Sequence, residues 1–322
     1  MIYIYNLGGV LILYMIFVYH LKGACSLDDN EFFRYICLAF HFFMGWFFFK
    51  SGMFFKNRDI SDLIRRSFKH LMIPYFIFSL LSLMIGFVIS MIIDNNLVTF
   101  FRLIPIQIVY DEAVSWNQAL WFLPSLYFVK VIYILLHKKK INDVAIMVVF
   151  VLLSIIMNYY SYKMSSPFHI PYYIGNVFLG MVFYAMGHCL RNANISRFLL
   201  YVITFIYVFH FFFPSSIDFY KNMLYGNYII SVVYFSSGIL LFNLMFKKFA
   251  NKPIPLLTHI GKFSMIYYVC HWPLIKCIKI YEVNSIVSGE TLYFFGFLLL
   301  CLFLWVCDLI FRSPKQKWMV GM

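Results

Sequence analysis

Long apolar runs alternate with short polar segments along almost the whole chain. Each run is close to 20 residues, the length that an α-helix needs to cross the hydrocarbon core of a bilayer. The runs are continuous and lack the strict alternation of membrane β-strands. The sequence therefore predicts one all-α polytopic membrane domain over residues 1–322, with about ten transmembrane helices. The predicted spans are 3–21, 33–54, 70–93, 119–137, 142–160, 172–190, 198–213, 227–246, 264–280 and 292–311.

Composition and charge agree with this pattern. The chain is 63% hydrophobic and only 12% charged, against about 25% charged residues in soluble domains. The net charge of +13 does not call for a nucleic-acid partner, because basic residues collect in the cytoplasmic loops of membrane proteins. With a cytoplasmic N-terminus, most lysines and arginines fall in loops on that side. The sequence therefore predicts that both termini are cytoplasmic.

Two histidines inside predicted spans are the first candidates for chemistry. An ionisable side chain within the bilayer is costly and is a functional candidate by default. Imidazole accepts and returns a proton near neutral pH, which suits general-base catalysis. His20 ends the first span, and His271 lies inside the ninth, next to Pro273. Each also has a structural interpretation, as an interfacial or helix-packing histidine. No HExxH or CxxC spacing is present, and we predict no metal site.

A basic segment follows the second span. Lys50 lies within that span. If the following segment is helical, adjacent turns would carry Arg65, Arg66 and Lys69. Such a cluster can hold the phosphates of a nucleotide-like donor. The alternative is that these residues only fix the orientation of the chain in the membrane.

Aromatic and amide side chains open the fourth span. Trp116 and Trp121 flank Asn117 in the segment WNQALWFLP. Tryptophans at the end of a span are typical of the aromatic belt. The same tryptophans with Asn117 could bind a sugar, through ring faces and hydroxyl hydrogen bonds.

Taken in order, several segments resemble the acyltransferase 3 family of integral membrane acyltransferases, and within it the sugar O-acetyltransferases of the fucose 4-O-acetylase type. The first span ends in a histidine, the second ends in Ser-Gly, and a late segment has a Gly-Lys-x-Ser then His pattern. The resemblance covers nearly the whole chain. The matching segments are YMIFVYH (residues 14–20), FFFKSG (47–52, with Lys50 and Ser51), LMIPY (71–75), LWFLPSL (120–126) and IGKFSMIYYVCHWPL (260–274).

The resemblance implies transfer of an acyl group, usually acetyl from acetyl-CoA, to a hydroxyl of a surface sugar or polysaccharide. It implies a multi-pass protein of the bacterial inner membrane, with acyl-CoA as a donor substrate rather than a tightly bound cofactor. His20 corresponds to the family's catalytic histidine. The basic segment near Arg65, Arg66 and Lys69 corresponds to the donor side. His271 is expected to orient the acceptor or to stabilise the oxyanion.

The chain departs from the family at two positions of the first span. The family usually has Asp fourteen residues, and Arg or Lys eleven residues, before the histidine, where this chain has Asn6 and Gly9. Lys50 is the candidate that would replace the missing cation. A catalytically silent family member in a polysaccharide biosynthesis complex is therefore one alternative.

A polysaccharide polymerase or flippase is another alternative. Polymerases of that kind tend to carry a larger outer loop with paired basic residues. The longest outer loop predicted here, residues 94–118, has a single basic residue, Arg102, which counts against a polymerase.

Overall fold

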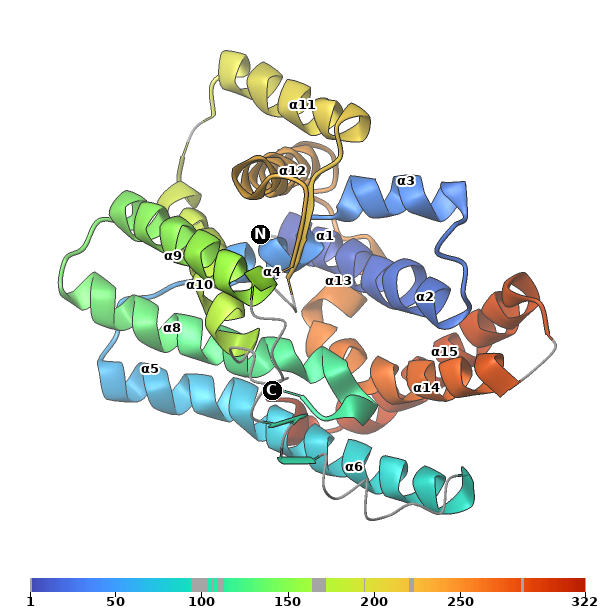
Figure 1. The fold of residues 1–322 in the computed structure, drawn as a ribbon. Helices are drawn as coiled ribbons and strands as arrows, with labels where there is room; N and C mark the ends of the chain where they lie inside the picture. Colours follow the sequence, from blue (N-terminus) through green and yellow to red (C-terminus); the bar gives the residue numbers. More distant parts are fainter. Residues whose placement is uncertain are drawn as a thin grey trace.

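The computed structural model describes residues 2–93, 104–105, 107–108, 113–163, 172–193, 195–219, 223–284 and 287–321. It is a bundle of helices joined mostly by short turns (Figure 1), which confirms the predicted all-α class. The first half contains α1 (Ile2–Leu13), η1 (Tyr14–Leu21), α2 (Lys22–Ala24), α3 (Glu31–Phe40), α4 (Phe43–Met53), α5 (Ile60–Ser67), η2 (Phe68–Met72), α6 (Ile73–Ile93), η3 (Ser115–Trp121) and α8 (Phe122–Lys138). The second half contains α9 (Asp143–Lys163), α10 (Tyr172–Leu190), α11 (Arg197–Phe212), α12 (Tyr228–Phe249), α13 (Pro255–Lys262), α14 (Ser264–Asn284), α15 (Gly289–Phe311) and η4 (Lys317–Val320).

Seven helical segments of the described chain are long and apolar enough to cross a membrane. Two shorter apolar helices, Gly175–Leu190 and Arg197–Phe212, accompany them. The predicted count of about ten spans stays a prediction. The segments are Ile2–Ala24, Glu31–Met53, Ile60–Ile92, Ser115–Lys138, Asp143–Tyr160, Tyr228–Phe249 and Gly289–Phe311.

The first helix lies at the centre of the bundle. In the segment Ile2–Ala24, 61% of the most apolar window is buried, against 17% for Asp143–Tyr160. The outer helices instead expose large apolar side chains such as Phe198 and Trp305. An apolar outer surface is what a bilayer solvates, so α1 and η1, like the equally buried segment Ser115–Lys138, are shielded from lipid.

Glycines let the central helices approach closely. A Cβ atom on Gly9 would overlap the carbonyl group of Leu257 in α13, and one on Gly261 would overlap that of Tyr5. Small residues at such crossings are common where helices associate in membranes, since they allow backbone-to-backbone contact. The crossing of α1 with α13 therefore requires glycine on both helices.

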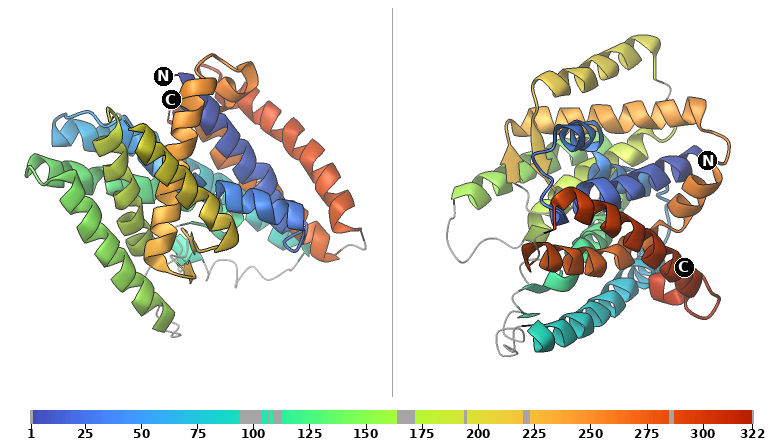
Figure 2. Two further views of the ribbon diagram at one scale, coloured as in Figure 1. Left: turned by 90° about the horizontal axis from the view of Figure 1, so that it is seen from above. Right: turned by 90° about the vertical axis from the view of Figure 1, so that its right-hand side faces the viewer.

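Both ends of the described chain lie on one side of the bundle (Figure 2). Near the N-terminus, Asn6 bonds to the turn between α12 and α13. Near the C-terminus, the carbonyl oxygen of Gly321 accepts from His70 Nδ1, in η2 just before α6. The common side agrees with the predicted topology; that this side is cytoplasmic stays a prediction.

A small β-hairpin forms the one sheet among the described residues. Strands β1 (Ser216–Asp218) and β2 (Met223–Tyr225) pair antiparallel, with Ile217 opposite Leu224. The hairpin joins α11 to α12 and carries Asp218 to the rim of a cavity.

Candidate active site

His20 lies in an irregular part of the central helix. Residues Tyr14–Leu21 continue α1 without a break but have π-helical hydrogen bonding. A π-helical turn is rare and is found frequently at functional sites, because the inserted residue changes which way side chains point. A second π-helical stretch lies at η2 (Phe68–Met72), so the irregular backbone marks the turn that carries His20 as a candidate without being particular to it.

The fold brings His20 against His271, which lies 251 residues further along the chain. The Nδ1 atom of His20 is 2.9 Å from Nε2 of His271, and the two rings are almost parallel, 10° apart. His271 is fully buried, whereas His20 lines a cavity. The two histidines that the sequence singled out thus form one hydrogen-bonded pair.

The surrounding hydrogen bonds assign the protons of this pair. His271 Nδ1 lies 2.8 Å from the carbonyl oxygen of Tyr268 and 3.1 Å from that of Tyr267. A carbonyl only accepts, so His271 Nδ1 carries hydrogen, and Nε2 of the neutral ring is the acceptor. His20 Nδ1 then donates to it. The remaining lone pair, on His20 Nε2, is the one that can take a proton from a substrate.

Asn117 stabilises the helical turn that carries His271. Pro273 has no N–H group, so the carbonyl of Val269, four residues earlier, loses its helical partner. The Nδ2 group of Asn117 donates to that carbonyl at 2.9 Å, and also to Ser82 Oγ at 3.2 Å. Asn117 is fully buried and these protein groups occupy its amide nitrogen. Its predicted contact with a sugar stays a prediction.

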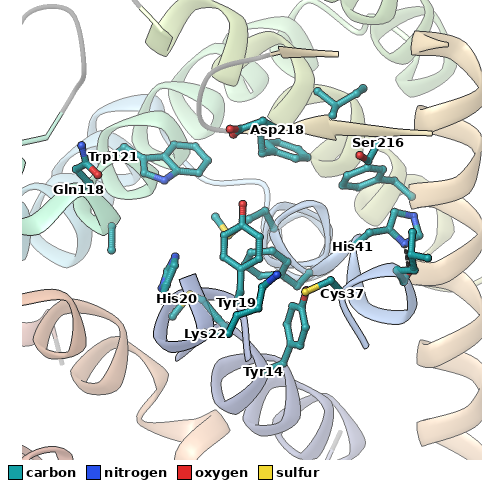
Figure 3. A pocket seen from close by; sticks show the side chains of 18 of the residues that line it. Tyr14, Tyr19, His20, Lys22, Cys37, His41, Gln118, Trp121, Ser216 and Asp218 are labelled. Carbon is teal, nitrogen blue, oxygen red and sulfur yellow. Dashed lines mark hydrogen bonds between the residues drawn. The ribbon is translucent and has the colours of Figure 1, made fainter. Parts of the chain in front are cut away.

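A cavity of about 450 Å³ lies beside the histidine pair, and we name it the histidine cavity. It contains groups of both charge signs; at its edge Lys22 and Asp28 form an ion pair of 2.9 Å. Figure 3 shows side chains from the helices and from the β-hairpin around one space. Its lining includes Tyr19, His20, Gln118, Trp121, Ser216 and Asp218.

A second cavity of about 540 Å³ has a different character, and we name it the basic cavity. None of its described lining residues is acidic. Arg66, on its wall, pairs with Asp62 at 3.1 Å. The polar side chains that line it include Lys50, Ser51, Lys56, Arg58, Arg66 and Lys130.

The same three helical segments line both cavities. Along α4, Phe43 lines the histidine cavity and Phe47 the basic cavity. Along α14, Tyr268 lines the first cavity and Met265 the second. In the segment Ser115–Lys138, Trp121 lines the first cavity and Phe122, at the start of α8, the second. The ring of Phe122 lies 6.1 Å from that of Phe47 and 5.8 Å from that of Tyr268. These three rings connect the lining of the basic cavity, which includes Phe47 and Phe122, to that of the histidine cavity, which includes Tyr268, and we name them the aromatic layer.

The remaining predicted site residues lie outside both cavities or at one edge. Arg65 and Lys69 are exposed and do not line the basic cavity. Trp116 is buried, with its indole against Gly86 of α6. Trp121 does line the histidine cavity. The binding roles predicted for these four side chains stay predictions.

Two further polar residues join the cavities without having been singled out. Lys130 lines the basic cavity from α8. Its charge inside a predicted span is the feature of the sequence that marks it as a candidate. Asp218 reaches the histidine cavity from the hairpin. No local pattern marks that segment, so only the fold identifies it.

The two positions that depart from the family pattern take part in helix contacts. The Nδ2 atom of Asn6 donates to the carbonyl oxygens of Ala250 and Lys252, at 2.7 and 2.8 Å. Gly9 lies against the backbone of Leu257, where no larger side chain fits. Asn6 and Gly9 therefore hold the turn and helix that follow α12, and neither lines a cavity described above.

Lys50 brings a cation to the same stretch of α1. Its Nζ atom lies 3.5 Å from the position that a Cβ atom on Gly8 would take, one residue from Gly9. It also lies 5.8 and 5.4 Å from the ring centres of Tyr5 and Trp46. A cation over aromatic faces is favourable, more so when partly desolvated. Lys50 therefore lies close to Gly9, the position of α1 at which the family usually has an arginine or lysine.

One group of side chains in the described chain has the donor atoms of a metal site. His137, Asp143 and His188 each offer a ligand atom, all within 4.8 Å of one another. The group lies outside both cavities. Its spacing along the chain matches no metal motif, so the sequence did not indicate it.

A histidine pair beside a polar cavity, inside a bundle of apolar helices, is an arrangement that suits an integral membrane enzyme. The family model described as an acyltransferase domain, acyltransferase 3, matches residues 2–312. The chain therefore belongs to the acyltransferase 3 family of membrane acyltransferases, as the order of motifs predicted. No curated protein and no solved structure matches the chain.

Proposed function

We propose that this protein is a membrane O-acyltransferase that moves an acetyl group from acetyl-CoA to a hydroxyl of a surface polysaccharide or its precursor, in the bacterial inner membrane. The observation that carries the proposal is the His20–His271 pair at the wall of the histidine cavity. The pair supplies one available lone pair, on His20 Nε2, inside a space large enough for a sugar ring.

The proposed reaction is a single acyl transfer. His20 Nε2 takes the proton of the acceptor hydroxyl as its oxygen attacks the thioester carbonyl. His271 Nε2 accepts from His20 Nδ1–H and so stabilises the imidazolium that forms. The carbon–sulfur bond breaks, and the departing thiolate of coenzyme A takes the proton back from His20. The products are the sugar ester and the free thiol.

The basic cavity supports the assignment of the donor side. Coenzyme A carries several phosphate charges, and lysine and arginine side chains bind phosphate through charge-assisted hydrogen bonds. The acceptor sugar needs no such cluster, which fits the mixed polarity of the histidine cavity. On this proposal the thioester end of the donor passes the aromatic layer to reach His20.

The test compares whole cells that express the wild type or His20→Ala at equal membrane levels. We expect the surface polysaccharide to carry base-labile O-acetyl groups in the first strain and to lack them in the second, by NMR. His259→Gln, a histidine outside both cavities, serves as the matched control and should keep the signal.

Equal acetylation in the His20→Ala strain would remove His20 from the mechanism. If neither strain carries O-acetyl groups and purified protein does not consume acetyl-CoA, the protein is the silent family member that Asn6 and Gly9 first suggested.

A further inference from the structure

Three helix ends meet at His137, Asp143 and His188. His137 lies in the last turn of α8, Asp143 begins α9 after a short turn (Figure 1), and His188 lies in the last turn of α10. One donor atom from each side chain lies within 4.8 Å of the others. The side chains of Asp143 and His188 are only 16% and 17% exposed. The acyl-transfer proposal uses none of these residues.

Their hydrogen bonds orient them toward one another. His188 Nδ1 lies 2.8 Å from Asp143 Oδ2 and 2.7 Å from the hydroxyl of Tyr133. That hydroxyl donates to Asp143 Oδ1 at 2.6 Å. Tyr133 is fully buried, so it fixes the carboxylate from the protein interior. An outer partner that holds a ligating carboxylate in this way is typical of metal sites.

An aromatic ring and a solvent-accessible hollow border the His137–Asp143–His188 cluster. The ring of Phe55 packs edge-on against both imidazoles, with ring centres 5.0 Å from His137 and 5.1 Å from His188. Two members of the cluster, His137 and Asp143, also line a hollow of about 650 Å³. Three protein ligands and an open fourth position for water match a common zinc arrangement.

The donor set favours zinc over the hard cations. Two imidazoles and one carboxylate suit a borderline metal ion, whereas calcium and magnesium prefer oxygen ligands throughout. Lys138 and Lys140 also line the hollow. Their charges would favour an anion or hydroxide as the fourth ligand rather than a second cation.

A second histidine–aspartate pair in the described chain, His259 with Asp308, lacks the third ligand that the His137–Asp143–His188 cluster has. His259 Nε2 lies 3.1 Å from Asp308 Oδ2, which resembles the His188–Asp143 pair. The third group beside Asp308 is the Arg312 guanidinium, 3.7 Å away, where the cluster has an imidazole. A cation in that place competes with a metal ion for the carboxylate.

We propose that His137, Asp143 and His188 bind a Zn²⁺ ion that ties together the ends of α8, α9 and α10. Because Phe55 contacts both imidazoles and also lines the basic cavity, the bound ion would fix one wall of that cavity. The site does not depend on the acyl-transfer proposal.

The experiment uses the purified full-length chain in detergent. The protein is stripped with EDTA, incubated with Zn²⁺, desalted, and its zinc is measured by mass spectrometry. We expect about one zinc per chain in the wild type and in the matched control His259→Gln, and a loss of most of it in His137→Gln and in His188→Gln. We expect Tyr133→Phe to weaken zinc binding about 10- to 100-fold.

Replacement by Co²⁺ gives a second measurement, since a tetrahedral site with nitrogen and oxygen ligands absorbs visible light. That spectrum should appear in the wild type and be absent in His137→Gln. Each variant is compared as a monodisperse species on size exclusion, so that misfolding is not taken for loss of a ligand. No retained zinc in the wild type, or equal zinc in the wild type and both ligand variants, overturns the proposal and leaves a hydrogen-bonded Tyr133–Asp143–His188 network.

Discussion

The two cavities differ in charge although the same helices line them. The basic cavity is lined by cations such as Lys50 and Lys130, and its described lining has no acid. The histidine cavity holds both signs, for example Lys22 and Asp28, together with His20. The charges of the basic cavity favour a polyanionic ligand. The mixed polarity of the histidine cavity suits a neutral ligand rich in hydroxyl groups. Helices that cross the whole bundle can therefore present different chemistry at each end while keeping the two sites in fixed register.

Removing the base from the histidine cavity should have the largest effect. We expect His20→Gln to lower kcat by about 10²- to 10⁴-fold with little change in the KM for acetyl-CoA, because general-base catalysis contributes that much. The measurement is acetyl transfer by purified protein. A variant with normal kcat would show that the lone pair of His20 does no chemistry.

Removing a cation from the basic cavity should act on the donor instead. We expect Lys50→Met to lower kcat/KM for acetyl-CoA by about 10- to 100-fold, the worth of a charge-assisted hydrogen bond. Arg197→Gln is the matched control, because Arg197 is exposed and lines neither cavity; it should change kcat/KM by less than about threefold. Equal losses in the two variants would mean that bulk charge, rather than the cavity, attracts the donor.

Opening the aromatic layer should change which acyl group is accepted. One methylene is worth about 10- to 200-fold in discrimination when a pocket wall excludes it. We expect Phe122→Ala to raise the ratio of propionyl to acetyl transfer by about tenfold, measured with the two donors in competition. An unchanged ratio would place the acyl path elsewhere. Phe150→Ala, a buried phenylalanine that lines neither cavity, controls for loss of core packing.

The sequence was most informative where a residue is unusual for its surroundings. His20, His271 and Lys50 stood out because charge or polarity within apolar runs is costly, and the fold brings the two histidines into contact. Their pairing could not be deduced, since it depends on a π-helical turn in one helix and a proline in another. Asn117 shows the limit most clearly. Its amide nitrogen hydrogen-bonds to the carbonyl that Pro273 leaves unpaired, a contact that the sequence pattern did not indicate, and its predicted sugar contact stays a prediction.

The predicted span count shows a related limit. The described helix α14 carries Lys276, Lys279 and Glu282 in its second half, and it is not among the seven segments that meet the length and apolarity of a span. Burial against neighbouring helices allows such residues inside a bundle. Hydropathy along the chain does not report that burial. The sequence therefore predicted that α14 is helical more readily than whether α14 crosses the membrane.

The smallest expected effect concerns the position where the family has an acid. The Nδ2 group of Asn6 donates to two carbonyl oxygens, and its Oδ1 accepts from Thr258 Oγ1. A carboxylate there would face those carbonyls without a donor, and one unsatisfied buried group costs about 1–3 kcal/mol. We expect Asn6→Asp to lower the thermal midpoint in detergent while the activity of the folded fraction stays within about threefold of wild type. Higher activity in Asn6→Asp would mean that the chain lost a catalytic acid, and that the contact to the turn after α12 is secondary. With the stability loss alone, the role of Asn6 is to hold the turn after α12 against α1, and the chemistry lies with His20 and His271.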